Sequence, residues 1–301
     1  MRLGFHLSIA GKLSRALREA RALGCQAVQI FVQNPRSWQE RRRAPEEVRE
    51  FTTSRRRLGI GLLVVHLSYL PNLAAADPEL YRRSRARFAL ELALARDLEA
   101  DYLVVHPGHG APESAGFQRV AAALAEAVSR VGSPPPLVLL ENTAGQGREL
   151  GWQPDQLAEI CALSGVPVGI CLDTAHAFGA GYDLRGAAGV QRLLADLAQG
   201  PGLERLRMLH LNDSRASLGS RRDRHMHLGR GAIGLEGLRL FLSHPWLRVQ
   251  AAIMETPRRH FLDDRHNLMV ARSLVGGTPA LPPGTGGGAL ALPGDHEYNG
   301  A

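Results

Sequence analysis

Short runs of apolar residues alternate along the chain with longer segments in which apolar residues recur three or four positions apart. Almost every position within a run is apolar, as is typical of parallel strands that are covered on both faces. The longer segments predict helices, for instance "SRALREARALG" (14–24) and "PDQLAEICALSG" (154–165), each closed by a glycine. The eight apolar runs end at polar positions, namely His6, Asn34, His66, His106, Glu141, Asp173, the segment 210–213 and Glu255.

Eight alternations of strand and helix in 301 residues predict the α/β class and, within it, a (β/α)8 TIM barrel. A doubly wound sheet is the competing layout, but it rarely needs so many strands with polar carboxyl ends. From Gly276 onward the chain is rich in glycine and proline and has no periodicity. We therefore expect a single catalytic barrel domain over 1–275, followed by a disordered tail over 276–301.

The formal net charge of +7 is carried almost entirely by arginine, since Lys12 is the only lysine. Arginine presents paired donors that match phosphate oxygens, so this composition fits a nucleic acid or a phosphorylated substrate. GC-rich coding or heat adaptation would explain the excess equally well. We assign the arginine runs at 41–43, 55–57 and 82–87 to solvated faces of helices, with only a weak part in binding.

The three cysteines are odd in number and far apart, which favours a reducing compartment over a disulfide framework. The N-terminal "MRLGFHLSIAG" lacks the apolar core of a secretory signal, and no stretch approaches the ~20 apolar residues of a membrane span. We therefore expect a soluble cytoplasmic protein that has no membrane partner.

Besides His6, six of the predicted strand ends carry an imidazole or a carboxylate, and in a TIM barrel such strand ends converge on the active site. One histidine at the end of an apolar strand is more often an ordinary core residue than a metal ligand. Six such groups at corresponding positions are hard to explain by packing, and together they favour zinc or a similar divalent ion. The six are His66, His106, Glu141, Asp173, His210 and Glu255.

Two further segments add candidate ligands to this ring. His176 lies three residues beyond Asp173, in a loop or a first helical turn. The pentapeptide "DRHMH" places Asp223, His225 and His227 at alternate positions, which share a face in an extended backbone. A third ion could take His176, Asp223 and one of the two histidines, and alternation alone does not say which.

Several longer segments resemble, in the same order, the signatures of the endonuclease IV family of apurinic/apyrimidinic (AP) endonucleases. They are "ENTAGQG" (141–147), "GICLDTAHAFGAGYDLR" (169–185), "HLNDSRASLGSRRDRHMHLGRGAIG" (210–234) and "METP" (254–257). Shorter motifs are similar as well, namely "QNPRSW" (33–38), "HLSYLPNL" (66–73) and "HPG" (106–108). The resemblance covers residues 1–273 and implies a monomeric (β/α)8 barrel that carries three zinc ions.

Carried over residue by residue, the resemblance implies nine ligands. The three sets are His66, His106 and Glu141; then Glu141, Asp173, His210 and Glu255; and then His176, Asp223 and His225. Glu141 would bridge the first two ions as the central catalytic residue, and His227 would take a structural role. Pro35 and Ala175 depart from the family pattern without removing a ligand.

The resemblance also implies hydrolysis of the phosphodiester 5′ to an abasic site in duplex DNA, which leaves a 3′-hydroxyl and a 5′-deoxyribose phosphate. Removal of groups that block 3′ ends would follow from the same geometry. An abasic nucleotide has little stacking to lose, so rotating it out of the duplex is comparatively easy. The implied DNA contacts are Asn34, Arg36, Tyr69, Leu70 and Arg224.

Some of these residues have other interpretations. Tyr69 could pack on the barrel rim, and Arg224 could pair with a neighbouring acid. For the whole chain, two other functions are a divalent-metal sugar isomerase or epimerase on the same barrel and a non-catalytic binder of damaged DNA.

Overall fold

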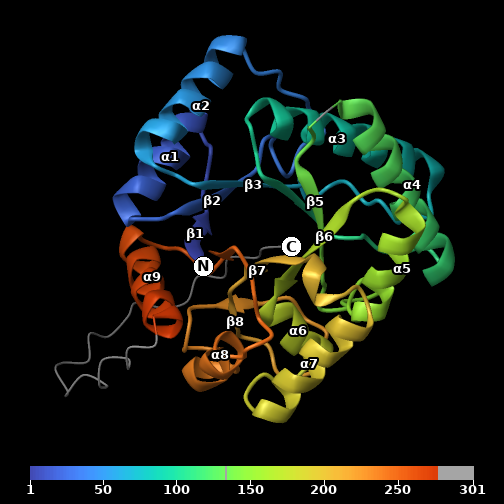
Figure 1. Cartoon of the computed structure of the whole chain (residues 1–301). Coiled ribbons are helices and arrows are strands. Elements are labelled where there is room, and N and C mark those ends of the chain that lie inside the picture. The colour runs from blue at the N-terminus through green and yellow to red at the C-terminus, as the bar shows by residue number, and fades with distance from the viewer. Residues whose placement is uncertain (133, 277–301) are drawn as a thin grey trace.

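Eight parallel strands close into a barrel, and helices surround it (Figure 1). The computed structural model describes residues 1–132 and 134–276. Around the barrel the strands follow the order β1-β10-β7-β6-β5-β4-β3-β2, so the predicted (β/α)8 fold is confirmed. Their bounds are β1 Arg2–His6, β2 Ala27–Ile30, β3 Leu62–His66, β4 Tyr102–Val105, β5 Leu137–Glu141, β6 Val168–Asp173, β7 Leu206–His210 and β10 Ala251–Met254.

The helices lie on the outside of the barrel, and the last, α9, packs beside the first, α1, to complete the ring (Figure 1). Their bounds are α1 Leu13–Leu23, α2 Pro45–Leu58, α3 Pro78–Asp97, α4 Glu113–Val131, α5 Pro154–Ser164, α6 Thr174–Ala180, α7 Ala187–Gln199, the 3-10 turn η1 Leu203–Arg205, α8 Gly234–Leu242 and α9 Phe261–Val275. Gly24 and Gly165 end α1 and α5 in the left-handed conformation, as predicted. Among the described residues no helix is long and apolar enough to cross a membrane.

Alternation along each strand decides which side chains reach the barrel interior. In β3, Leu63 and Val65 pack in the layer between the barrel and the helices, whereas Leu62 and Val64 belong to the separate cluster inside the barrel. His66 continues the inner row at the carboxyl end of the strand. The same alternation operates in the neighbouring strands, so polar residues that end the inner rows converge at one mouth of the barrel.

A short antiparallel pair extends the mouth beyond the barrel itself. β8 (Asp213–Ser214) pairs with β9 (His225–Met226), with Ser214 opposite His225. The buried Asp213 carboxylate then accepts the backbone N–H groups of Gly229, Gly231 and Ile233 at 2.9–3.0 Å. This carboxylate therefore holds the turn that follows β9.

Three expectations about local structure need correction. β2 ends at Ile30, so Asn34 lies in the following loop rather than at the end of a strand. The arginines at 41–43 precede α2, because Pro45 begins that helix, and the Arg43 side chain is only 4% exposed. Arg87, in the run at 82–87, is 2% exposed rather than solvated. The predicted tail lies outside the described residues except for Gly276.

Gly4 allows β1 to approach β2 closely. A Cβ atom at Gly4 would lie 2.0 Å from the backbone oxygen of Ala27, which cannot move without shifting the strand. We expect Gly4→Ala to lower the free energy of unfolding by about 2–3 kcal/mol, measured by urea denaturation.

Gly61→Ala is the matched control, because its Cβ would meet the flexible Arg2 side chain, with Nε at 3.3 Å. It should change the stability by less than about 0.5 kcal/mol. Equal urea midpoints for the two variants would contradict this account of the β1–β2 contact.

Candidate metal centre

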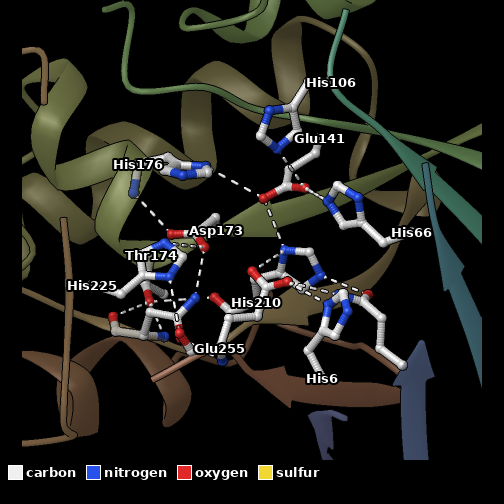
Figure 2. Close-up of polar contacts among 12 residues, drawn as sticks. His6, His66, His106, Glu141, Asp173, Thr174, His176, His210, His225 and Glu255 are labelled. Carbon is white, nitrogen blue, oxygen red and sulfur yellow. Dashed lines mark hydrogen bonds and ion pairs between the residues drawn. The ribbon is translucent and has the colours of Figure 1, made fainter. Parts of the chain in front are cut away.

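The fully buried carboxylate of Glu141, at the end of β5, lies at the centre of the barrel mouth (Figure 2). Its Oε2 atom is 3.3 Å from Nε2 of His66 and 3.0 Å from Nε2 of His106. Its Oε1 atom is 2.8 Å from Nδ1 of His210 and 3.3 Å from Nδ1 of His176. The two oxygens of one carboxylate therefore face two different pairs of imidazoles.

The ligand candidates gather in three overlapping groups whose donor atoms lie within 4.8 Å of one another. The groups are His66, His106 and Glu141; Glu141, Asp173, His210 and Glu255; and Asp173, His176 and His225. The first two contain the residues that the resemblance assigns to the first two ions. In the third group Asp173 adds to the implied set, and Asp223 Oδ1 lies 3.3 Å from Nε2 of both His176 and His225.

Backbone carbonyls orient three of the imidazoles. Nδ1 of His66 donates to the carbonyl of the next residue at 2.7 Å, Nδ1 of His176 donates to Asn142 at 2.9 Å, and Nδ1 of His225 donates to Glu255 at 3.2 Å. A carbonyl oxygen only accepts, so in each neutral ring Nδ1 carries the proton and the Nε2 lone pair remains for a cation.

The residues present fit a divalent cation. Nε2 of His176 and Nε2 of His225 are buried and make no hydrogen bond, although carboxylate oxygens lie 3.3 Å away, so each can accept a further binding partner. Glu141, Asp173, Asp223 and Glu255 bring four carboxylates to the same mouth, where they repel one another unless positive charges offset them. Mixed imidazole and carboxylate donors suit zinc and similar ions.

Proximity shifts the pKa values of these groups in opposite directions. Burial raises the pKa of Glu141, but the imidazoles of His210 and His106 lower it more, so that it lies well below its usual range. Burial lowers the pKa of His225, but the carboxylates of Asp173 and Asp223 outweigh it and raise that pKa to about 9. His225 therefore holds a proton at neutral pH unless a cation displaces it.

Two amide side chains that the sequence analysis did not single out orient the carboxylates. Asn212 donates to Asp173 Oδ2 at 2.7 Å and accepts the backbone N–H of Glu255 at 2.8 Å. Gln29 donates to Glu255 Oε1 at 2.7 Å, and its Oε1 lies 2.9 Å from Nε2 of His210. The only sequence signal for these two residues is a single amide side chain in or just after an apolar strand, Gln29 in "AVQIF" and Asn212 in "HLND".

Two other histidines lie beside the cluster. His6 Nδ1 is 3.2 Å from Glu255 Oε1, which places it next to a candidate ligand. His227 Nδ1 instead faces Asn267 of α9, which donates to it at 2.9 Å. Of the two histidines in "DRHMH", His225 is the one that the structure brings to the cluster.

The predicted DNA contacts lie on loops at the rim of the mouth. Asn34, Arg36 and Arg224 are exposed, and Leu70 is half-buried. Tyr69 is 61% exposed, although its ring also lies 5.1 Å from that of Phe31. Arg224 donates to the backbone oxygen of Asp223 and makes no ion pair with another described residue.

A closed parallel barrel with a buried cluster of imidazoles and carboxylates at its mouth defines a metal-dependent enzyme of the TIM barrel class. Residues 17–273 match the family described as xylose isomerase-like TIM barrel. A relative from Chloroflexus aurantiacus named probable endonuclease 4 is 43% identical over 283 residues, which cover 92% of this chain and 99% of that one. The chain therefore belongs to the endonuclease IV family.

Solved structures agree with this assignment. The crystal structure of endonuclease IV from Thermus thermophilus has a TM-score of 0.84 and 42% identity, and the match covers 92% of this chain and 100% of that chain. D-psicose 3-epimerase with D-fructose has a TM-score of 0.67 and 14% identity over 92% of this chain and 100% of that chain, which indicates a shared fold alone. The family and the three residue groups together indicate a divalent-metal centre.

Because the candidate ligand His225 holds a proton at neutral pH, cation binding should release protons to the solvent. We expect calorimetric titration of metal-free protein with ZnCl2 at pH 7.5 to show release of at least about one proton per chain, from heats in buffers of different ionisation enthalpy. The affinity should fall as the pH drops below about 9, because protons then compete for His225.

Two variants test the source of these protons. His225→Ala should release about one proton fewer than the parent, because that ring is charged before binding. His227→Ala should leave the release unchanged, because burial lowers the pKa of His227, which lies outside the cluster. Binding heats that do not depend on the buffer would contradict the predicted proton release.

Proposed function

We propose that this protein is a zinc-dependent AP endonuclease of base excision repair. It hydrolyses the phosphodiester 5′ to an abasic site in duplex DNA, leaving a 3′-hydroxyl and a 5′-deoxyribose phosphate, and it removes groups that block 3′ ends. The observation that carries the proposal is the cluster around Glu141 in a chain of the endonuclease IV family. Endonucleases of this family are DNA-cleaving hydrolases. What we propose beyond this is the lesion that the protein recognises, the bond that it cuts and the metal that it uses.

Three zinc ions per chain form part of the proposal. The ligands are His66, His106 and Glu141; Glu141, Asp173, His210 and Glu255; and His176, Asp223 and His225. Oε2 of Glu141 faces the two histidines of the first set and its Oε1 faces His210 of the second set, which supports its role as a bridging ligand. When bound, ions in such sites activate water as a nucleophile and offset charge on the phosphate oxygens.

The chain itself selects and positions the substrate. Arg36 and Tyr69 are exposed on neighbouring loops beside the metal centre, with the partly exposed Leu70 next in sequence. Planar and apolar side chains of this kind can enter a duplex where a base is missing and turn the abasic nucleotide toward the barrel. Asn34 and Arg224 would then contact the flanking backbone, since an exposed guanidinium binds phosphate oxygens in pairs.

We also propose how the chain is organised. Residues 1–275 would form one catalytic domain and 276–301 a separate tail, in a protein that acts as a monomer in the cytoplasm.

Two alternative functions fit the observations less well. A sugar epimerase shares the barrel but needs neither the third residue group nor an exposed Tyr69. A non-catalytic binder of damaged DNA would have no use for nine candidate ligands.

A duplex that contains one tetrahydrofuran abasic analogue tests the reaction. We expect the zinc-loaded protein to cut it on the 5′ side of the analogue, to leave a 3′-hydroxyl that a polymerase extends, and to leave an unmodified duplex intact. Removing the metal with EDTA should abolish cutting, because no side chain of the cluster can take over the activation of the attacking water. The analogue cannot undergo β-elimination, so binding without a cut would refute the hydrolase proposal.

The two histidines of "DRHMH" test the third site. His225→Ala should lose about one of three zinc ions per chain by elemental analysis, and its cleavage rate should fall at least about a hundredfold. His227→Ala should keep all its zinc and cut within about threefold of the parent rate, because it faces α9. Equal losses in both variants would show that the assignment is wrong, and one ion in the reconstituted parent would favour an epimerase.

A further inference from the structure

Helix α3 carries three buried polar residues on one face. Ser84, Arg87 and Glu91 are spaced by three and four positions, so they share a face, and their exposures are 0%, 2% and 0%. The inner face of a barrel helix is ordinarily apolar, because it packs on the strands. This polar face therefore needs a reason other than packing.

Glu91 holds the loop that follows β3. Its Oε1 accepts the hydroxyl of Ser68 at 2.5 Å, and its Oε2 accepts the backbone N–H of the same residue at 3.1 Å. Ser68 lies between the candidate ligand His66 and the exposed Tyr69. Farther along this loop, Ser84 of α3 accepts the backbone N–H of Asn72 at 2.8 Å. The polar face thus fixes the loop on both sides of Tyr69.

Arg87 holds the loop that follows β2. Its guanidinium donates to the backbone carbonyl of Ser37, the residue after the exposed Arg36, and its Cζ lies 6.0 Å from the centroid of the Trp38 ring. Its Nε is 3.5 Å from Glu91 Oε1. One ion pair on α3 therefore connects the two loops that carry the proposed inserting residues.

The two loops also contact each other directly. The backbone N–H of Tyr69 donates to the carbonyl of Pro35 at 3.2 Å. The Gln33 side chain closes the first loop by accepting the backbone N–H of Arg41 at 2.9 Å and donating to its carbonyl at 2.8 Å. Together with the ion pair, these contacts leave the loops little freedom while their tips stay exposed.

Stability alone does not account for the pair. Burying a guanidinium and a carboxylate requires desolvation of both, and apolar residues of similar size often give equal or greater stability. Two nitrogens of Arg87, Nε and Nη1, are buried without a hydrogen-bond partner among the described residues, which adds to this cost. What the pair provides, and apolar residues would not, is hydrogen bonding to the two loops.

We infer that Arg87 and Glu91 are positioning residues for the recognition of abasic DNA. They hold the loops so that Arg36 and Tyr69 project from the rim before DNA binds, which removes the cost of ordering those loops on binding. This inference rests on the proposed function and adds two residues that do not themselves contact the substrate. Loss of this positioning should raise KM for the abasic duplex and change kcat little.

The test compares two arginines of α3. Arg87→Met removes the buried guanidinium, and the control Arg82→Met removes the same charge from a side chain that is 69% exposed. On the tetrahydrofuran duplex with zinc-loaded protein, we expect Arg87→Met to raise KM about tenfold and to leave kcat within about twofold. Arg82→Met should keep KM within about twofold, and both variants should retain the zinc content of the parent.

Ser68→Ala is a second, milder variant, for use if Arg87→Met does not fold. It removes only the hydroxyl that donates a hydrogen bond to Glu91, and it should raise KM about threefold at unchanged zinc content. If the variants that fold match Arg82→Met in KM, the pair merely stabilises the helix and the inference is overturned while the proposed function stands. A parent protein that leaves the duplex intact overturns the proposed function, and the inference with it.

Discussion

The buried charge of Glu141 is the constraint on which the rest of the mouth depends. A carboxylate with no exposed surface must be compensated, and here four imidazoles from other strands and loops lie within 3.3 Å of it. Two of these imidazoles, His176 and His210, also lie beside the carboxylates of Asp223 and Glu255. Asp173 in turn lies beside His225. Such a cluster is stable only with cations or with protons in their place, so folding, protonation and metal binding are linked.

Two kinds of support keep this cluster in place. Backbone carbonyls fix the rings of His66, His176 and His225, and amide side chains such as Asn212 hold the carboxylates. These partners lie on or next to barrel strands, at the carboxyl ends where the cluster forms. The rim is built differently, because its loops stay exposed and are held from behind by a buried polar face on α3.

The comparisons separate what the fold provides from what the site provides. Sugar epimerases share the barrel at low sequence identity, so the architecture by itself specifies no reaction. The endonuclease IV relatives match this chain over nearly its whole described length at much higher identity. In this chain the mouth of the barrel carries three groups of candidate ligands and two neighbouring loops with exposed tips.

The sequence by itself determined the barrel and most of the candidate ligands, because strand ends such as His66, Glu141 and Asp173 are readable from uninterrupted apolar runs. Alternation left His225 and His227 open, and the family resemblance favoured His225. The tertiary structure supplies the physical reason: β9 ends at Met226, so alternation does not continue and His227 turns to α9. The roles of Gln29, Asn212 and Arg87 could not be predicted from the sequence. Their burial and partners come from segments distant in the chain, and no local pattern records those neighbours.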